Sequence, residues 1–375
     1  MATVRKRTWV NKSGVTQQAW NVDYKDSQGN RRFETFKLKK QADARLTVIQ
    51  AELAKGIHTP TSASKTVREA AEIWYKRGLA KNEAATMRNY RHLLDAYILP
   101  ELGRHKLSSL TKPGVFLFRD HLVEKGASAV TANKVLHALK GVLKTAEEYG
   151  MVSQNVASGV TVATSNRDQR RLEVGIDVPT KAELKAMIDA STGRWRPLII
   201  TLCFAALRAS EIRGLLWNAV DLDGRVIHIR ERADRFNQAG PPKSKAGRRD
   251  IPLSPMLVNT LREWRLKLRS SKSGLVFPSQ ADTPLWHSGI VNDWFRPLQR
   301  RLGIVDGDGQ PKYPLHSLRH FCASHWIELG FQPKQIQTML GHSSIVMTYD
   351  RYGHWMPNPE ADQERLAKGD LFVTG

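Results

Sequence analysis

Cysteine is scarce in this sequence, and its scarcity limits the kinds of site that the chain can hold. Only Cys203 and Cys322 occur among the 375 residues, whereas an all-cysteine zinc site needs four thiolates. Both lie in apolar stretches, where a free thiol behaves as a small buried hydrophobe. Cysteine usage therefore predicts free thiols, no metal site and a reducing, cytoplasmic location.

Long apolar runs are also missing. The amino-terminal stretch MATVRKRTWV lacks the apolar core of a signal peptide. No run reaches the roughly 18 apolar residues that a membrane-spanning helix requires. We expect neither export nor contact with a membrane.

Acidic residues are too few to balance the basic ones. The chain has 58 Lys and Arg against 36 Asp and Glu, which gives a net charge of +22 and a pI of about 10.1. Such an excess predicts a polyanionic partner, because neutralising phosphates releases counterions and drives binding. The excess is spread along the chain, so every region is a candidate for contact with nucleic acid. Composition alone leaves an RNA-binding protein open beside a DNA-binding one.

The first 57 residues predict a small module of strands and a helix. Three short runs alternate between apolar and polar residues and are separated by turn-like stretches that contain Asn and Gly. The runs cover residues 9–10, 19–24 and 32–36. A helix is expected from about Gln41 to Lys55, followed by a linker.

Residues 66–160 predict a helical domain. Thr66 and Glu69 have the spacing of a capping box at the start of the first helix. Pro100 is expected to stop the second helix, and Gly126 and Gly150 to stop the third and fourth. The later helices are expected at about 87–98, 115–125 and 129–149.

A polar linker over residues 161–177 precedes a third region, which runs from 178 to 356. Thr180 and Glu183 form another capping box. An apolar helix is expected from Leu198 to Leu207, and Ser210 is expected to cap the next helix. Arg208 would therefore project from a junction between two helices.

Two strands are expected further on, at residues 225–230 and 250–253. A basic loop that contains Lys243 and Lys245 lies between them, and we expect Lys243 at the tip of a hairpin. An unperturbed lysine pKa of about 10.4 keeps such a side chain protonated at neutral pH.

The richest stretch for chemistry runs from His316 to His354. His316 and Arg319 are three residues apart, so a helix would present both on one face. Arginine offers a planar fork of donors for phosphate oxygens, and histidine can move a proton near neutral pH. Tyr349 and Tyr352 follow, and tyrosine can act as a covalent nucleophile. The combination points to chemistry at a phosphodiester.

Three parts of that stretch carry a resemblance to a known family. His-Ser-Leu-Arg-His, Leu-Gly-His-Ser-Ser and Thr-Tyr-Asp-Arg-Tyr-Gly-His, in this order, resemble the carboxy-terminal signature of the tyrosine recombinases, the phage integrase family. The stretch Ala-Ala-Leu-Arg-Ala-Ser-Glu before it resembles the first arginine box of the family, with Ala206 where the family usually has Gly. Ser317 also departs from the family, which often has Asp there.

The resemblance implies a mainly α, multidomain α+β architecture. It assigns an arm-type DNA-binding-like module to residues 1–57 and a helical core-binding domain to 66–160. It also assigns a mixed α/β catalytic domain to 178–356 and a carboxy-terminal tail to 357–375.

The resemblance also implies the roles of particular residues. Arg208 and Arg319 would clamp the scissile phosphate, and Glu211 would orient an arginine. Lys243 would protonate the leaving 5′ oxygen, and His316 would help to remove the phenolic proton of the nucleophile. His342 would bond a non-bridging oxygen. Tyr352, which precedes Gly-His, would be the nucleophile.

Other assignments compete with these. Lys245 is the alternative to Lys243, and Tyr349 is the alternative to Tyr352, although Tyr349 occupies a slot that is usually apolar and is expected to pack. His316, His320 and His325 have spacings that suggest zinc. No cysteine or carboxylate completes a ligand set, so we expect His320 and His325 on the helix surface or behind the reacting groups.

The resemblance thus implies a site-specific recombinase that cuts and rejoins double-stranded DNA at attachment sites through a 3′-phosphotyrosyl link. It would integrate or excise a phage or mobile element in a bacterial cytoplasm, without metal or cofactor. The family implies a homotetramer on DNA, with accessory DNA-bending or excision proteins as further partners. A DNA-binding protein without cleavage activity, and an enzyme of the type IB topoisomerase or resolvase kind, are the alternatives.

Overall fold

The structure is a computed structural model that describes residues 2–11, 14–26, 29–54, 64–163, 171–268 and 271–356. Contacts divide the chain into two compact units, Met1–Gln169 and Arg170–Gly375. The expected carboxy-terminal tail and parts of both expected linkers lie outside the described residues. The three hydrophobic clusters cover residues 2–53, 67–162 and 172–356, so Val162 and Leu172 of the predicted linker pack with the clusters beside them. The finer division of the first unit stays a prediction.

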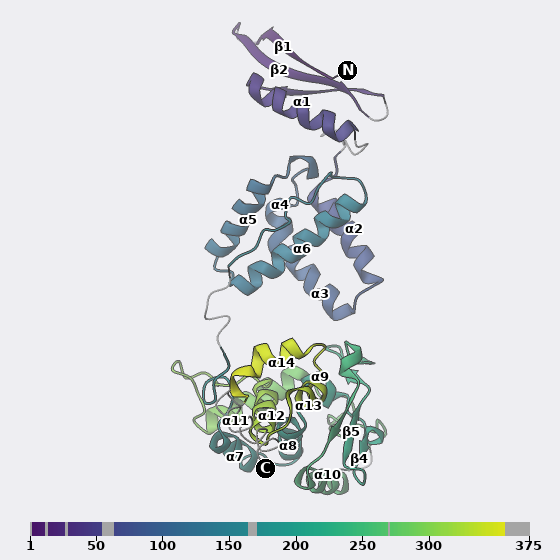
Figure 1. Cartoon of the computed structure of the whole chain (residues 1–375), viewed down its shortest axis with the longest axis vertical. Helices are drawn as coiled ribbons and strands as arrows, with labels where there is room; N and C mark the ends of the chain where they lie inside the picture. The colour runs from purple at the N-terminus through teal and green to yellow at the C-terminus, as the bar shows by residue number, and fades with distance from the viewer. Residues whose placement is uncertain are drawn as a thin grey trace, which may run out of the picture. The chain divides into compact units, whose positions relative to one another are not determined.

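The chain begins with a three-stranded antiparallel sheet covered by one helix (Figure 1). The elements are β1 (Thr3–Val10), β2 (Thr16–Lys25), β3 (Arg31–Phe36) and α1 (Lys39–Ala54). Val22 and Tyr24 of the central strand pack against Ala42 and Ile49 of α1. This arrangement confirms the predicted sheet-plus-helix module, with strands longer than expected.

The rest of the first unit is helical (Figure 1). Its helices are α2 (Val67–Leu79), α3 (Ala84–Leu93), α4 (Leu99–Leu102), α5 (Lys112–Glu124) and α6 (Ala129–Glu148). The Thr66–Glu69 capping box forms, with the Glu69 backbone N–H donating to Thr66 Oγ1 at 3.2 Å. Gly126 and Gly150 follow α5 and α6 with positive φ angles, as helix-ending glycines do.

Pro100 does not stop its helix, contrary to the prediction. A π-helical turn over Leu94–Ile98 precedes it, and α4 continues through Pro100 to Leu102. A π turn bonds each N–H one residue further back and widens the helix locally. The chain thereby restarts as α4 with Pro100 in its first turn, where the missing N–H and the ring are tolerated.

The second unit combines a group of helices with two small sheets (Figure 1). Strands β4 (Val220–Asp221), β5 (Val226–Ile229) and β8 (Arg249–Pro252) form one sheet, and β6 (Arg232–Ala233) pairs with β7 (Ala239–Gly240) in the other. The helices are α7 (Lys181–Asp189), α8 (Trp195–Ala205), α9 (Ala209–Arg213), α10 (Pro255–Lys267), α11 (Arg296–Arg301), α12 (Ser317–Glu328), α13 (Pro333–Leu340) and α14 (Ile345–Tyr352). The mixed α/β domain is therefore as predicted.

Two local predictions for this unit are wrong. The β5–β8 pair forms, but the β6–β7 hairpin is inserted between its strands, so Lys243 follows β7 and does not lie at a hairpin tip. Ser210 lies inside α9, and Arg208 occupies the cap position instead. The Glu211 side chain accepts the Arg208 backbone N–H at 2.8 Å, which fixes the helix start two residues earlier than expected.

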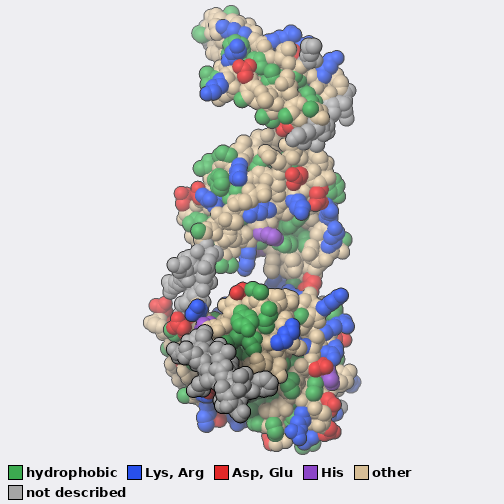
Figure 2. All heavy atoms as spheres, viewed as in Figure 1, with side chains coloured by type: hydrophobic (Ala, Val, Ile, Leu, Met, Phe, Trp, Pro, Cys, Tyr) green, Lys and Arg blue, Asp and Glu red, His purple; other side chains and the backbone are tan. Residues whose placement is uncertain are grey.

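Lysine and arginine side chains occur on the surfaces of both units (Figure 2). None of the helices in the described part of the chain has the length and apolar composition needed to span a bilayer. Cys203 and Cys322 are buried free thiols, as predicted.

Candidate active site

The first predicted catalytic residue, Arg208, lies where α8 passes into α9. Ala206 ends α8 in the left-handed region with φ of 48°, a conformation that explains why the family usually has Gly there. This turn leads directly to Arg208, whose side chain remains about one third exposed. Arg208 Nη1 donates to Glu211 Oε1 at 2.8 Å, so the junction fixes the direction of the guanidinium.

Helix α12 presents the next group of residues from its first turn. His316 caps the helix, and Arg319 and His320 follow on the same side, at i+3 and i+4. The rings of His316 and His320 meet edge to face with centroids 4.7 Å apart. Arg319 is 2% exposed, and its guanidinium donates to the Ala206 and Leu340 carbonyls.

The carboxy-terminal end of α13 holds three arginines. The consecutive carbonyls of Met339, Leu340 and Gly341 accept hydrogen bonds from Arg249, Arg319 and Arg208, respectively. The last carbonyls of a helix have no partner within it and carry partial negative charge, so they suit guanidinium donors. One helix end thus places residues from α9, β8 and α12 side by side.

Glu211 is the only carboxylate in the described chain that bonds these arginines, and it binds two of them. Besides Arg208, it accepts a bidentate pair from Arg249, with Nη1 to Oε1 at 2.9 Å and Nη2 to Oε2 at 2.8 Å. Burial alone would raise the pKa of Glu211. The hydrogen bonds and charge of Arg249, together with the charge of Arg208, outweigh burial and lower the pKa to about 2. Glu211 is therefore ionised, and the cluster keeps an excess of positive charge.

The three arginines differ in how many guanidinium N–H groups are not used in hydrogen bonds within the protein. A guanidinium has five N–H donors. Arg249 directs four hydrogen bonds to Met339, Gly247 and Glu211, so it is largely used by the protein. The Arg208 and Arg319 guanidiniums make two such bonds each and keep donors for an outside anion. Burial and the charge of Arg208 lower the pKa of Arg319 to about 9, so an anion there would be favoured electrostatically.

Tyr352 is buried against this cluster, and Tyr349 is not. Tyr352 is 1% exposed, whereas Tyr349 is 50% exposed, contrary to the expectation that Tyr349 packs. Tyr352 Oη lies 2.8 Å from His320 Nδ1. Burial raises the pKa of Tyr352 to about 12 despite the opposing charges of Arg319 and Arg351. The phenol is protonated at rest.

His316 and His342 are neutral imidazoles in this setting. Burial and the charges of Arg319 and Arg208 lower the pKa of each to about 4. His342 Nδ1 lies 3.0 Å from Thr348 Oγ1, which holds the ring parallel to that of Tyr352. The site therefore offers neutral histidines as hydrogen-bond partners for a phosphate.

Lys243 is the one predicted catalytic residue that the structure does not bring into this cluster. Its side chain is exposed, and within the described residues no hydrogen bond or ion pair joins it to the arginines or to Tyr352. It lies in the segment between β7 and β8, just before the turn Lys245–Gly247. The Ala246 and Gly247 backbone contacts Gly341 and Arg249, so the segment borders the cluster.

Sequence reasoning missed two residues of the site. Arg249 follows the strand alternation of β8, in which Arg249 and Ile251 are both buried, so the pattern did place a charge inward. His320 was expected on the helix surface or behind the reacting groups, yet it touches the phenol oxygen itself. Its spacing from His316 and Arg319 was the available signal.

Two further features lie apart from this chemistry. Ser317, the departure from the family Asp, is buried, and its hydroxyl has no hydrogen-bond partner within the described residues.

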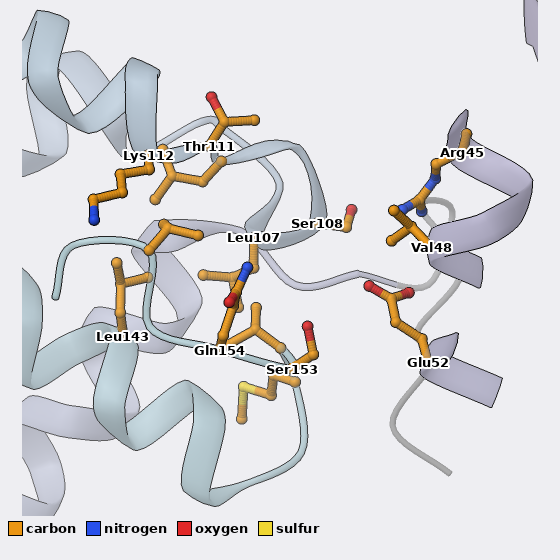
Figure 3. Close-up of a pocket in the computed structure, with 14 residues that line it drawn as sticks. Arg45, Val48, Glu52, Leu107, Ser108, Thr111, Lys112, Leu143, Ser153 and Gln154 are labelled. Atoms are coloured by element: carbon orange, nitrogen blue, oxygen red, sulfur yellow. The ribbon is translucent and has the colours of Figure 1, made fainter. Parts of the chain in front are cut away.

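A pocket of the first unit is lined by α1 residues Arg45 and Glu52 and by Ser108, Lys112 and Gln154 (Figure 3). None of the predicted catalytic residues lines that pocket.

Comparison with known proteins shows which family this chain is similar to. A family model described as the phage integrase family matches residues 178–358. The chain is 22% identical over 364 residues to a tyrosine recombinase XerC-like protein of Caldanaerobacter subterraneus subsp. tengcongensis, covering 90% of this chain and 91% of that relative. It is 25% identical to a putative prophage phiRv2 integrase of Mycobacterium tuberculosis, covering 86% of this chain and 84% of the relative.

Solved structures of integrases share the fold. The Tn1549 transposon integrase in complex with a circular intermediate DNA superposes with a TM-score of 0.68 at 20% identity, over 81% of this chain and all of that one. A lambda integrase tetramer bound to a Holliday junction gives a TM-score of 0.59 at 19% identity, over 90% of this chain and 95% of that one. The architecture, the family model and the relatives agree, and the chain belongs to the tyrosine recombinase family, the phage integrases.

Proposed function

We propose that this protein is a site-specific DNA recombinase that cuts and rejoins double-stranded DNA through a 3′-phosphotyrosyl intermediate. The observation that carries the proposal is the cluster in which Arg208 and Arg319 keep free donors beside the buried Tyr352. An anion that accepts these donors would sit next to the phenol, and a backbone phosphate of DNA is such an anion.

In the proposed reaction the two arginines hold the charge of the pentavalent phosphate, the kind of fixed electrostatic stabilisation that is usually the largest catalytic contribution. The Tyr352 oxygen forms a bond to phosphorus as the bond to the 5′ oxygen breaks, and the phenolic proton passes to a neighbouring histidine. Lys243 supplies a proton to the departing 5′ oxygen, which requires its segment to approach the phosphate when DNA binds. His316 and His342 hydrogen-bond the phosphate. A 5′ hydroxyl from a second strand then reverses the step.

Glu211 and Arg249 influence this site through Arg208 and without contacting DNA. Glu211 fixes Arg208 from both its backbone N–H and its side chain, and Arg249 fixes Glu211. We assign both residues to positioning and not to reaction with DNA.

Exchange of strands between two duplexes needs four such sites, and we propose that the protein works as a homotetramer on DNA. The lambda integrase tetramer on a Holliday junction, which shares the fold, supports this assembly. Relatives named as prophage integrases support integration or excision of a phage or mobile element within a bacterial cytoplasm. Accessory DNA-bending or excision proteins remain part of the proposal.

A covalent-trapping assay tests the reaction and the nucleophile together. The protein, Tyr352→Phe and Tyr349→Phe are each mixed with nicked duplexes tiled across the DNA that flanks the gene, with and without EDTA. We expect a protein–DNA adduct on a denaturing gel with the natural protein and with Tyr349→Phe, and none with Tyr352→Phe. An adduct that persists in Tyr352→Phe would move the nucleophile to Tyr349, and loss of the adduct caused by EDTA would contradict metal-independent cleavage.

The same assay separates the alternative functions. Binding without an adduct on any duplex would favour a DNA-binding protein that does not cleave. Adducts that form without joining of the cut end to a partner duplex, together with relaxation of supercoiled DNA, would favour a type IB topoisomerase or resolvase.

A further inference from the structure

The hydroxyl of Tyr352 has one histidine partner, and it is not the one that the family resemblance suggested. His320 Nδ1 lies 2.8 Å from Tyr352 Oη, whereas no hydrogen bond joins His316 to Tyr352 within the described residues. His316 instead packs edge to face against the His320 ring. Of the two histidines, only His320 lies in position to receive the phenolic proton directly.

The tautomer that fits this contact follows from the protonation of both groups. Tyr352 is a protonated phenol and can donate its single O–H. His320 is a neutral imidazole, because burial and the surrounding charges lower its pKa to about 3. With its proton on Nε2, His320 presents the lone pair of Nδ1 to the phenol. The hydrogen bond then has the direction that proton transfer requires.

We propose that His320 is a catalytic residue that accepts the proton of Tyr352 during DNA cleavage, an inference that rests on the proposed recombinase function. In the step, the Oη–H bond of Tyr352 breaks as its oxygen bonds phosphorus, and His320 Nδ1 takes the proton. The bond from phosphorus to the 5′ oxygen breaks, and that oxygen receives a proton from Lys243. In the return step a 5′ hydroxyl attacks phosphorus and gives its proton to the neutral Lys243. The bond from phosphorus to the Tyr352 oxygen breaks, and His320 returns its proton to that oxygen.

Bound DNA makes this transfer easier than it is in the protein alone. After burial, the groups that hold down the basicity of His320 are His316, Arg351, Arg319 and His342. A phosphate between the arginines compensates their positive charge, so an imidazolium beside them becomes less costly. The same phosphate draws the Tyr352 oxygen toward phosphorus. His320 therefore gains basicity only when substrate is present.

Asparagine and alanine substitutions of His320 distinguish proton transfer from simple positioning. Asparagine places a polar atom near the position of Nδ1 and can hold the phenol, but it cannot take the proton, and alanine does neither. We measure single-turnover adduct formation with His320→Asn, His320→Ala, and His316→Asn as the matched control. General bases contribute about 10²–10⁴-fold, so both His320 variants should slow adduct formation by roughly 100-fold or more, and His316→Asn by less.

The outcomes are decisive in each direction. A His320→Asn rate near that of the natural protein would overturn the proposal and leave His320 a positioning residue, and a larger loss in His316→Asn would transfer the role to His316. DNA affinity and melting temperature are recorded for each variant, because a variant that no longer folds or binds reports on neither role. An absent adduct with the natural protein would overturn the proposed function and this inference together.

A spectroscopic measurement on folded protein does not depend on those variants. In protein labelled with ¹⁵N-histidine, the Nδ1 of His320 should resonate as an unprotonated, hydrogen-bond-accepting nitrogen and should shift in Tyr352→Phe. An Nδ1 that carries the proton in the natural protein would contradict the proposed direction of transfer.

Discussion

At the scale of single residues, Glu211 is the group on which the arginine cluster depends. It is 2% exposed and bonds both Arg208 and Arg249, so its charge is required to hold the buried Arg249 near the partly exposed Arg208. A buried pair of this kind is a weak source of net stability, but breaking it leaves an uncompensated charge. Its loss therefore affects stability and catalysis at the same time.

The low pKa of Glu211 predicts how stability varies with acid. The pKa is about 2 in the folded protein and about 4.3 in an unfolded chain, so the folded state favours the ionised form. Its stabilisation is present above about pH 4.3 and is lost as the pH falls toward 2. The difference corresponds to about 3 kcal/mol. Glu211→Gln should lose that amount at pH 7, as measured by urea unfolding, and should show a smaller loss between pH 4.3 and 2 than the natural protein.

An exposed glutamate in the same unit gives the control for that experiment. Glu263 lies on the exposed side of α10, and Glu263→Gln should leave stability unchanged within about 0.5 kcal/mol. If Glu211→Gln behaved like Glu263→Gln at pH 7, the bonds between Glu211 and the arginines would not carry the role given to them here.

The residues of the site could be predicted from the sequence where they lie in short motifs, and not where their partners are distant in the chain. Arg208, Glu211, His316, Arg319 and Tyr352 lie in short motifs, and the structure brings them together. Arg249 was not found, because its bonds reach Glu211, 38 residues away, and Met339, 90 residues away. No local pattern shows which buried partner lies at the other end of such a bond.

At the scale of elements, the turn after α13 decides where the arginines lie. Gly341 has a φ of 66°, and its carbonyl accepts from Arg208. A Cβ at this position would lie 2.8 Å from the Ala246 carbonyl oxygen and 3.0 Å from Arg249 Cδ. The glycine is therefore required by its backbone angle and by the close approach of the segment that carries Lys243.

Gly341→Ala should lower both stability and cleavage. The left-handed angle alone costs a residue with a Cβ about 1–2 kcal/mol, and the contact with backbone adds to that cost. We expect a loss of about 2 kcal/mol or more in urea unfolding, and slower adduct formation because the Arg208 and Arg249 contacts shift. The comparison of unfolding free energies between this variant and a matched glycine variant measures the contribution of the contact.

Gly303 is the matched position. Its φ is 68°, and a Cβ there would meet no atom within 4 Å in the structure. Gly303→Ala should cost only about 1–2 kcal/mol from the backbone angle and leave cleavage unchanged. Equal losses of unfolding free energy in both variants would contradict this prediction. They would show that an added Cβ at Gly341 costs no more than the backbone angle does.

The ends of helices were predicted best where one residue or one short motif determines the local backbone conformation. Capping boxes and glycine stops lie where the sequence placed them, since each acts through its own backbone and near neighbours. Pro100 and Ser210 misled the prediction because a neighbouring π turn and the Glu211 side chain override their local preferences. The inserted β6–β7 hairpin was missed because strands of two residues carry almost no pattern.

At the scale of the whole molecule, charge is the feature that the sequence predicts most directly. The net charge of +22 is distributed over both units, and basic side chains are exposed on each (Figure 2). Fold and family explain the sign, because both units of a recombinase are expected to contact the DNA backbone. Which bases are read is not encoded in the charge, because phosphate contacts position a protein without specifying sequence.

The distributed charge predicts a steep dependence of DNA binding on salt. Each neutralised phosphate contributes about −0.9 to the slope of log K against log salt, so a protein with roughly 6–10 phosphate contacts loses about 10³–10⁵ in affinity between 50 and 200 mM salt. We expect a loss in this range, measured by fluorescence anisotropy with Tyr352→Phe so that no covalent adduct forms. Sucrose at matching osmolality should leave the affinity unchanged. A slope equivalent to fewer than about three phosphates would mean that the positive charge of one or both units does not face DNA, because two units that both contact the backbone cannot release so few counterions.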